Sequence, residues 1–157
     1  MALGVLFLVT ACGADAGQGR SCTAIGTLVG VSLDVGLTTA ETGTIEVCWD
    51  GRCTTPALDL FPSSRAAGGT CAGTAPTDVC GASAVPTGGK HAYVAIPDLP
   101  DRPVTVRLRL ADRAGTAVVD HELSATPAMS YPNGPDCGGG GPQLVVSVGA
   151  DGSVAAK

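Results

Sequence analysis

The chain has few aromatic residues, few lysines and no long apolar run, and each shortage limits what the protein can be. Only 3% of its 157 residues are aromatic, so a core has to be built mainly from valine, leucine and alanine. Lysine and arginine together number 9 against 14 acidic residues, and the net charge is −5. This balance argues against nucleic-acid binding, which depends on clustered basic side chains.

Continuous apolar stretches are too short for a membrane-spanning helix, which needs roughly 20 residues. Glycine and proline are abundant instead, with 23 and 11 residues. Both residue types disfavour long helices. Their placement between short apolar segments predicts many strands joined by turns within one domain.

The sequence LVTAC at residues 8–12 resembles a bacterial lipobox, at which an exported protein is cut before a cysteine that then receives lipid. The resemblance implies a signal peptide over residues 1–11 and a diacylglycerol thioether on Cys12. The glycine-rich residues 12–21 would form a flexible tether. Because two acyl chains anchor a protein stably, we expect a lipid-anchored protein on the outer face of the cell membrane.

This N-terminal region also allows other interpretations. No lysine or arginine precedes Cys12, although signal peptides open with basic residues. That absence favours a start codon further upstream. The alternative to a signal peptide is a buried N-terminal strand.

Six cysteines remain once Cys12 is set aside, an even number that predicts disulfides in an oxidising compartment. They are Cys22, Cys48, Cys53, Cys71, Cys80 and Cys137. The spacing of these residues favours one of the many possible pairings.

Cys48 and Cys53 flank Asp50-Gly51, a strong signal for a two-residue hairpin turn. In such a hairpin the cysteines form a non-hydrogen-bonded pair with Cα atoms about 4.5 Å apart, which suits a disulfide. The spacing would also let two thiolates bind zinc. No second Cys or His pair completes a zinc site, so we predict a disulfide and no metal.

The other pairings follow partly by elimination. Cys71 and Cys80 lie within residues 62–89, a segment rich in Gly, Ser, Thr and Pro that we predict to be a long loop pinned by a Cys71–Cys80 bridge. Cys22 then pairs with Cys137 and ties the first ordered residues to the approach of the last strand. Closing a loop of that span stabilises the fold by about 4–5 kcal/mol.

Alternation of apolar and polar residues predicts about seven strands and no helix. The strands lie at residues 29–37, 45–49, 52–55, 92–96, 104–110, 117–123 and 144–148. After them, an Asp-Gly turn leads to a short tail. An antiparallel two-sheet sandwich of immunoglobulin-like form over residues 22–157 would bury their apolar faces. A small barrel is the alternative.

One hairpin, closed by an Asp-Arg-Ala-Gly turn, has a register that can be predicted from its apolar faces. Matching these faces places Leu108 opposite Val119 and Arg107 opposite Asp120. We expect Arg107 and Arg109 to point outward and to pair with strand neighbours such as Asp120.

Two segments resemble sequences that occur together in one group of proteins. Residues 47–53 match a V-C-x-D-G-x-C hairpin, and residues 131–138 match a Y-P-N-G-P-x-C segment before a final strand. Both recur in small exported lipoproteins of high-G+C Gram-positive bacteria, a group with no assigned activity. The resemblance covers most of the chain from Cys12 onward, and it implies location and fold more than function.

No catalytic motif stands out, because the sequence has no G-x-S-x-G, H-E-x-x-H or Walker loop. His121 is the best-placed titratable residue, but strand alternation separates it from Asp120 and Glu122 and puts it on an apolar face. We predict a core or rim histidine there. His91 has no evident partner. We assign no catalytic residue and no cofactor, and a glycosidase-like pair of carboxylates would depend on the tertiary arrangement.

Two segments could form a binding surface on such a scaffold, residues 62–89 and residues 127–142; the alternative is plain connecting structure. Our first hypothesis is a non-catalytic module that contacts another envelope component. The second is a binding module for a small solute or cell-wall glycan, which requires a concave pocket with convergent polar groups. The third is a hydrolase that uses carboxylates or His121.

Overall fold

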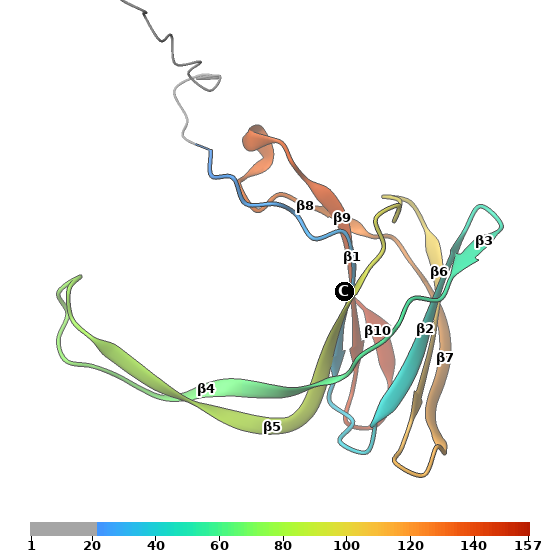
Figure 1. Ribbon diagram of the computed structural model, residues 1–157, viewed down its shortest axis with the longest axis horizontal. Helices are drawn as coiled ribbons and strands as arrows, with labels where there is room; N and C mark the ends of the chain where they lie inside the picture. The colour runs from blue at the N-terminus through green and yellow to red at the C-terminus, as the bar shows by residue number, and fades with distance from the viewer. Residues whose placement is uncertain (1–21) are drawn as a thin grey trace, which may run out of the picture.

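The computed structural model describes residues 22–157, which form two β-sheets packed face to face (Figure 1). The predicted signal peptide, Cys12 and the tether lie outside the described residues. The all-β sandwich predicted from the sequence is confirmed, with ten strands in place of about seven. The three strands that were not predicted are β4 (Phe61–Cys71), β8 (Ala128–Ser130) and β10 (Val154–Ala156).

The strands are β1 (Gly30–Val35), β2 (Thr42–Trp49), β3 (Arg52–Thr54), β4 (Phe61–Cys71), β5 (Cys80–Ala95), β6 (Val104–Ala111), β7 (Ala117–Ala125), β8 (Ala128–Ser130), β9 (Gly141–Val148) and β10 (Val154–Ala156). A short 3-10 helix, η2 (Pro135–Cys137), precedes β9. Within the described part of the chain, no helix is long and apolar enough to cross a membrane.

The larger sheet has the order β10-β9-β1-β5-β4, with β8 also paired to β9, and the smaller has the order β3-β2-β6-β7. Neighbouring strands are antiparallel except β1 and β9, which run parallel. A parallel pair needs a long connection, and here the chain from β2 to β8 supplies it. The predicted tail is wrong, because Val154 packs against the core and β10 pairs with β9.

The core between the sheets is aliphatic, as expected from the shortage of aromatic residues. The largest fully buried side chains are Leu33, Ile45, Leu108, Leu110, Leu144, Val31, Val47, Val104, Val106 and Val146. No polar or charged side chain within residues 22–157 is buried. The strands therefore owe their association to apolar burial and backbone pairing.

Three disulfides join the pairs favoured by the sequence, with Cα–Cα distances of 5.6 Å for Cys22–Cys137 and 4.0 Å for both Cys48–Cys53 and Cys71–Cys80. Cys48 lies opposite Cys53 in the β2–β3 hairpin, as predicted. The turn residues Asp50 and Gly51 have φ values of 49° and 72°. Positive φ at both positions is what a two-residue turn of this type requires.

The segment predicted as a loop, residues 62–89, is instead most of a long β-hairpin formed by β4 and β5. Small residues have weak strand preferences, so the sequence carried little strand signal, whereas cross-strand pairing decides the structure. The hairpin extends away from the sandwich (Figure 1), and its outer part is exposed on both faces. We call residues 62–88 the hairpin arm. The Cys71–Cys80 disulfide joins the last paired residues of its ladder.

The β6–β7 hairpin has the predicted facing, but the predicted register is wrong by two residues. Leu108 lies opposite His121, not opposite Val119. Two features cause the difference. The Asp112 amide donates to the Thr116 carbonyl at 2.9 Å, which tightens the turn, and a bulge follows it. A shift of two residues leaves every side chain on its predicted face.

Asp120 links the two arginines on the outer face of the smaller sheet. Arg107 lies opposite Glu122 rather than Asp120, yet the Asp120 carboxylate accepts hydrogen bonds from Nε of Arg107 at 3.3 Å and of Arg109 at 3.0 Å. Hydrogen bonds from Arg109 and then Arg107 hold the pKa of Asp120 below its ordinary value. The expected outward pairing of the arginines is therefore present in a shifted register.

Removal of the long-range disulfide Cys22–Cys137 and removal of the local disulfide Cys71–Cys80 should affect different parts of the fold. Cys22→Ser/Cys137→Ser should lower the free energy of unfolding by about 4–5 kcal/mol, because the unfolded chain loses a large closed loop. Cys71→Ser/Cys80→Ser should lower it by less than about 1 kcal/mol, because the freed end of the hairpin arm can open locally. Denaturant unfolding measures both changes, and hydrogen exchange should show lost protection confined to the arm. Equal destabilisation by the two variants would contradict this division.

The stabilising effect of Asp120 should depend on pH in one direction. Its folded-state pKa is lowered, so its contribution is present above the unfolded value of about 3.9 and is lost as the pH falls through the folded value. Asp120→Asn should therefore lower the melting temperature at neutral pH and have no effect in strong acid. Glu122→Gln is the matched control, and a pH-independent effect of Asp120→Asn would contradict the argument.

Candidate binding site

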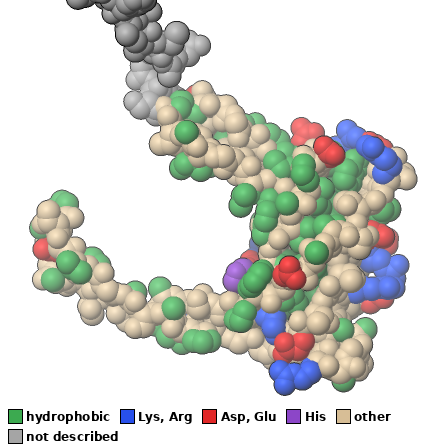
Figure 2. Space-filling view, viewed as in Figure 1, with side chains coloured by type: hydrophobic (Ala, Val, Ile, Leu, Met, Phe, Trp, Pro, Cys, Tyr) green, Lys and Arg blue, Asp and Glu red, His purple; other side chains and the backbone are tan. Residues whose placement is uncertain are grey.

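The larger sheet turns one face to the core and the other to a hollow between two projections (Figures 1 and 2). One projection is the hairpin arm. The other, which we call the tether arm, consists of residues 22–29 together with residues 128–143. Figure 2 shows the hollow as the concave side of a crescent. The outward face of the larger sheet is its floor.

Strand alternation decides which side chains reach this floor. Ala92 and Val94 of β5 are buried in the core, so His91 and Tyr93 point outward. Asp34 of β1 is likewise exposed between two buried neighbours. These outward positions form the polar and aromatic surface of the hollow.

Cross-strand pairing collects four outward residues into one row. Phe61 of β4 lies opposite His91 of β5, His91 lies opposite Asp34 of β1, and Asp34 lies opposite Ser147 of β9. The four come from strands that are far apart in the sequence. The row crosses the floor from the base of the hairpin arm toward the centre of the sheet.

An open pocket of about 300 Å³ lies along this row. Its lining includes Asp34 and the hydroxyl residues Ser63, Thr87 and Ser147. The Thr87 hydroxyl donates to the Ser63 carbonyl oxygen at 3.2 Å and accepts from the Gly89 amide at 3.3 Å. These bonds orient the base of the hairpin arm over the sheet and fix the pocket wall.

The pocket lining contains one acidic side chain, Asp34, and one basic side chain, Lys90. The Lys90 ammonium donates to the Ala40 carbonyl at 2.5 Å and lies 3.3 Å from the Glu41 carboxylate. Within residues 22–157, Asp34 takes part in no ion pair. Its carboxylate is thus free to accept hydrogen bonds from a bound molecule.

Two aromatic side chains, Phe61 and Tyr93, lie on the floor near His91 but outside the lining of the pocket. Phe61 is 56% exposed, and its ring centroid lies 6.1 Å from that of His91 at an interplanar angle of 37°. Tyr93 extends over Gly30, where a Cβ atom would lie 3.0 Å from the phenol oxygen. Partial burial raises the pKa of Tyr93 above its ordinary value. The floor therefore offers apolar ring faces next to hydrogen-bonding groups.

Ser63 and His91 resemble part of a nucleophilic constellation but lack its third interaction. The Ser63 hydroxyl lies 3.2 Å from Nδ1 of His91, and Asp34 lies opposite His91 on the next strand. In the described chain, no carboxylate comes within 4.0 Å of that ring to orient it. Within the described residues, the pair therefore lacks the third, orienting group of a catalytic triad.

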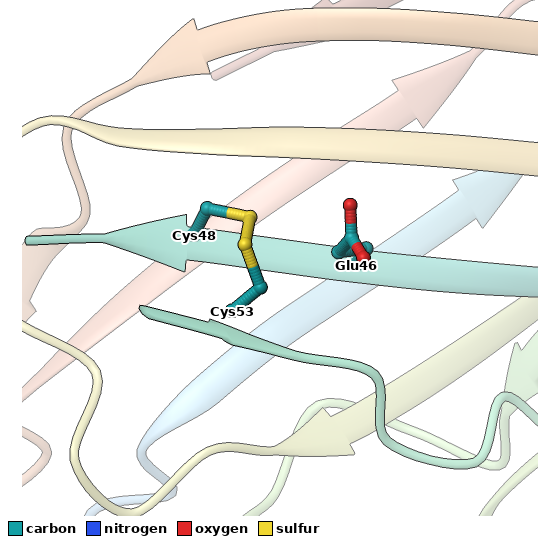
Figure 3. A group of neighbouring side chains, drawn as sticks. All are labelled: Glu46, Cys48 and Cys53. Atoms are coloured by element: carbon teal, nitrogen blue, oxygen red, sulfur yellow. A yellow bond between two sulfur atoms is a disulfide. The ribbon is translucent and has the colours of Figure 1, made fainter. Parts of the chain in front are cut away.

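A three-residue cluster on the smaller sheet is the best candidate for a metal site. One ligand atom each from Glu46, Cys48 and Cys53 lies within 4.8 Å of the other two (Figure 3). The two sulfur atoms are bonded to each other, and metal ions bind thiolates. In the disulfide form, the cluster therefore leaves only the Glu46 carboxylate as a ligand.

The residues singled out from the sequence are distributed over the molecule rather than gathered in one site. His121 is exposed on β7 in the smaller sheet, away from the hollow. Asp98 and Asp101 are exposed and follow β5. The two predicted binding segments lie in the hairpin arm and the tether arm, so they flank the hollow instead of forming its floor.

Sequence reasoning missed the floor of the hollow. The alternation of Ala92 and Val94 with His91 and Tyr93 was visible and could have placed the latter pair outward. The presence of Phe61 beside them was not visible, because β4 had no strand signal.

Comparison with protein-family models, with curated proteins and with solved structures finds no match for this chain. The geometry of the hollow is therefore the basis on which a function can be argued.

Proposed function

We propose that this protein is a lipid-anchored extracytoplasmic binding module that holds a cell-wall glycan in the hollow. The observation that carries the proposal is the row of Phe61, His91 and Asp34 beside a pocket lined with hydroxyl groups. A sugar presents apolar C–H faces and many hydroxyl groups. Ring faces match the first, and carboxylate and hydroxyl oxygens match the second.

The open shape of the pocket supports an extended ligand. The pocket lies at the base of the hairpin arm, on the larger sheet, and it is open rather than enclosed within the sandwich. A chain molecule could cross the floor while one unit occupies the pocket. An enclosed site for a small solute would instead bury most of its ligand.

An envelope protein is the second candidate ligand. The hairpin arm favours it, because β4 is an edge strand whose outer backbone groups have no strand partner in the described fold. Such an edge can accept a strand from another protein.

The export part of the proposal rests on the lipobox resemblance and on three disulfides, which persist in oxidising compartments. Protein extracted from membranes should begin at Cys12, carry two or three acyl chains and contain no free thiol, which intact-mass measurement and thiol labelling check. Cys12→Ser should abolish acylation of the chain, which metabolic labelling with a fatty acid measures. Unmodified Cys12 in membrane-bound protein would contradict this anchoring.

The glycan part can be tested with soluble fragments released from a Gram-positive cell wall. Phe61→Ala and Asp34→Asn should each weaken binding roughly tenfold, because each removes a ring contact or a charged acceptor. Calorimetric titration measures the affinities. Val79→Ala and Asp101→Asn are matched controls on exposed positions outside the hollow.

Two results would contradict glycan binding. One is equal weakening by the floor variants and their controls. The other is no binding of any fragment by the wild type. Cross-linking of an envelope protein that is lost with Phe61→Ala, in the absence of glycan binding, would favour the second candidate.

A further inference from the structure

The tether arm is a thin layer held together by bonds between distant segments. The Cys22–Cys137 disulfide closes its end. The Asn133 side-chain amide donates to the Ile25 carbonyl at 2.8 Å, and the Gln143 amide donates to the Leu28 carbonyl at 2.6 Å. The arm is therefore an ordered element, although it lies outside the core.

Four large apolar side chains are exposed on this arm. The exposed fractions are 58% for Ile25, 61% for Leu28, 41% for Met129 and 41% for Tyr131. These four make up half of the eight large apolar residues that are exposed in the described chain. Grouped exposed apolar residues indicate an interaction surface.

The same arm is almost free of charge. Residues 22–29 contain no charged residue, and residues 126–148 contain only Asp136. Figure 2 shows the charged side chains gathered mainly on the side of the molecule away from the two arms. A surface that only faces water normally carries mixed charges, whereas a surface that enters a lipid interface does not.

The position of the arm relative to Cys12 points to one partner. Nine residues lie between Cys12 and Cys22, and the ten steps from one cysteine to the other span at most about 36 Å in a fully extended chain. If Cys12 carries lipid, the tether arm is the part of the domain held closest to the membrane. Such a short connection between Cys12 and Cys22 also keeps the local concentration of the tether arm at the membrane high.

From these observations we infer that the tether arm lies against the outer leaflet of the membrane and inserts Ile25, Leu28, Met129 and Tyr131 into its interface. The inference rests on the proposed anchoring at Cys12. The arm would then fix the orientation of the domain. The hollow would open along the membrane surface, with the hairpin arm on its far side.

The test uses oxidised residues 13–157, which retain every strand and all three disulfides but lack the apolar run and Cys12. Co-sedimentation with vesicles of phosphatidylethanolamine and phosphatidylglycerol in equal parts measures binding by the arm alone. Ile25→Ser/Leu28→Ser should weaken partitioning roughly tenfold, since two inserted side chains are lost. Val79→Ser/Val85→Ser is the matched control on the hairpin arm and should bind like the wild type.

A fluorescence experiment locates the contact independently of affinity. In a Trp49→Phe background, Met129→Trp should shift its emission to shorter wavelength when vesicles are added, and Val79→Trp should not. No vesicle binding by residues 13–157, or a shift at position 79 and not at 129, would overturn the inference. The truncated chain of residues 13–157 lacks Cys12, so its failure to bind vesicles would refute only the membrane contact of the tether arm. An unmodified Cys12 in the mass measurement would instead refute the lipid anchoring.

Discussion

The structure depends on the alternation of inward and outward side chains along strands that enclose an aliphatic core. Buried valines and leucines of both sheets hold the sandwich together without a buried polar group in the described chain. In β5 this requirement is strict. A slip of one residue would bury His91 and Tyr93 and expose Ala92 and Val94. The same packing that stabilises the fold thus places the aromatic and titratable side chains on the floor of the hollow.

Disulfides stabilise the two arms, which lie outside the hydrophobic core. The hairpin arm and the tether arm bury little apolar surface, and an isolated hairpin is only marginally stable in water. Cys71–Cys80 and Cys22–Cys137 each close one of these arms. The sandwich thus relies on packing and the arms rely on cross-links. This division explains how a protein of this size can maintain projections on either side of a concave surface.

The tether arm and the floor of the hollow have different surface chemistry, and we assign them different functions. The tether arm combines exposed apolar residues, little charge and a short separation in sequence from Cys12, which suit a membrane surface. The floor combines rings, hydroxyls and the Asp34 carboxylate, which suit a polar ligand with apolar faces. The charged residues of the smaller sheet, such as Asp120 with its two arginines, face the opposite side.

Much of the fold could be predicted from local signals. Apolar alternation identified seven strands, the Asp50-Gly51 turn identified the Cys48–Cys53 hairpin, and cysteine parity led to the three disulfide pairs, because each of these depends on residues close in sequence or on counting. The hairpin arm could not be predicted, since its alanines and glycines have no strand preference of their own. The parallel pairing of β1 with β9 and the row from Phe61 to Ser147 also required the tertiary structure. Both join segments far apart in the chain, and only the packing of the two sheets determines which strands become neighbours.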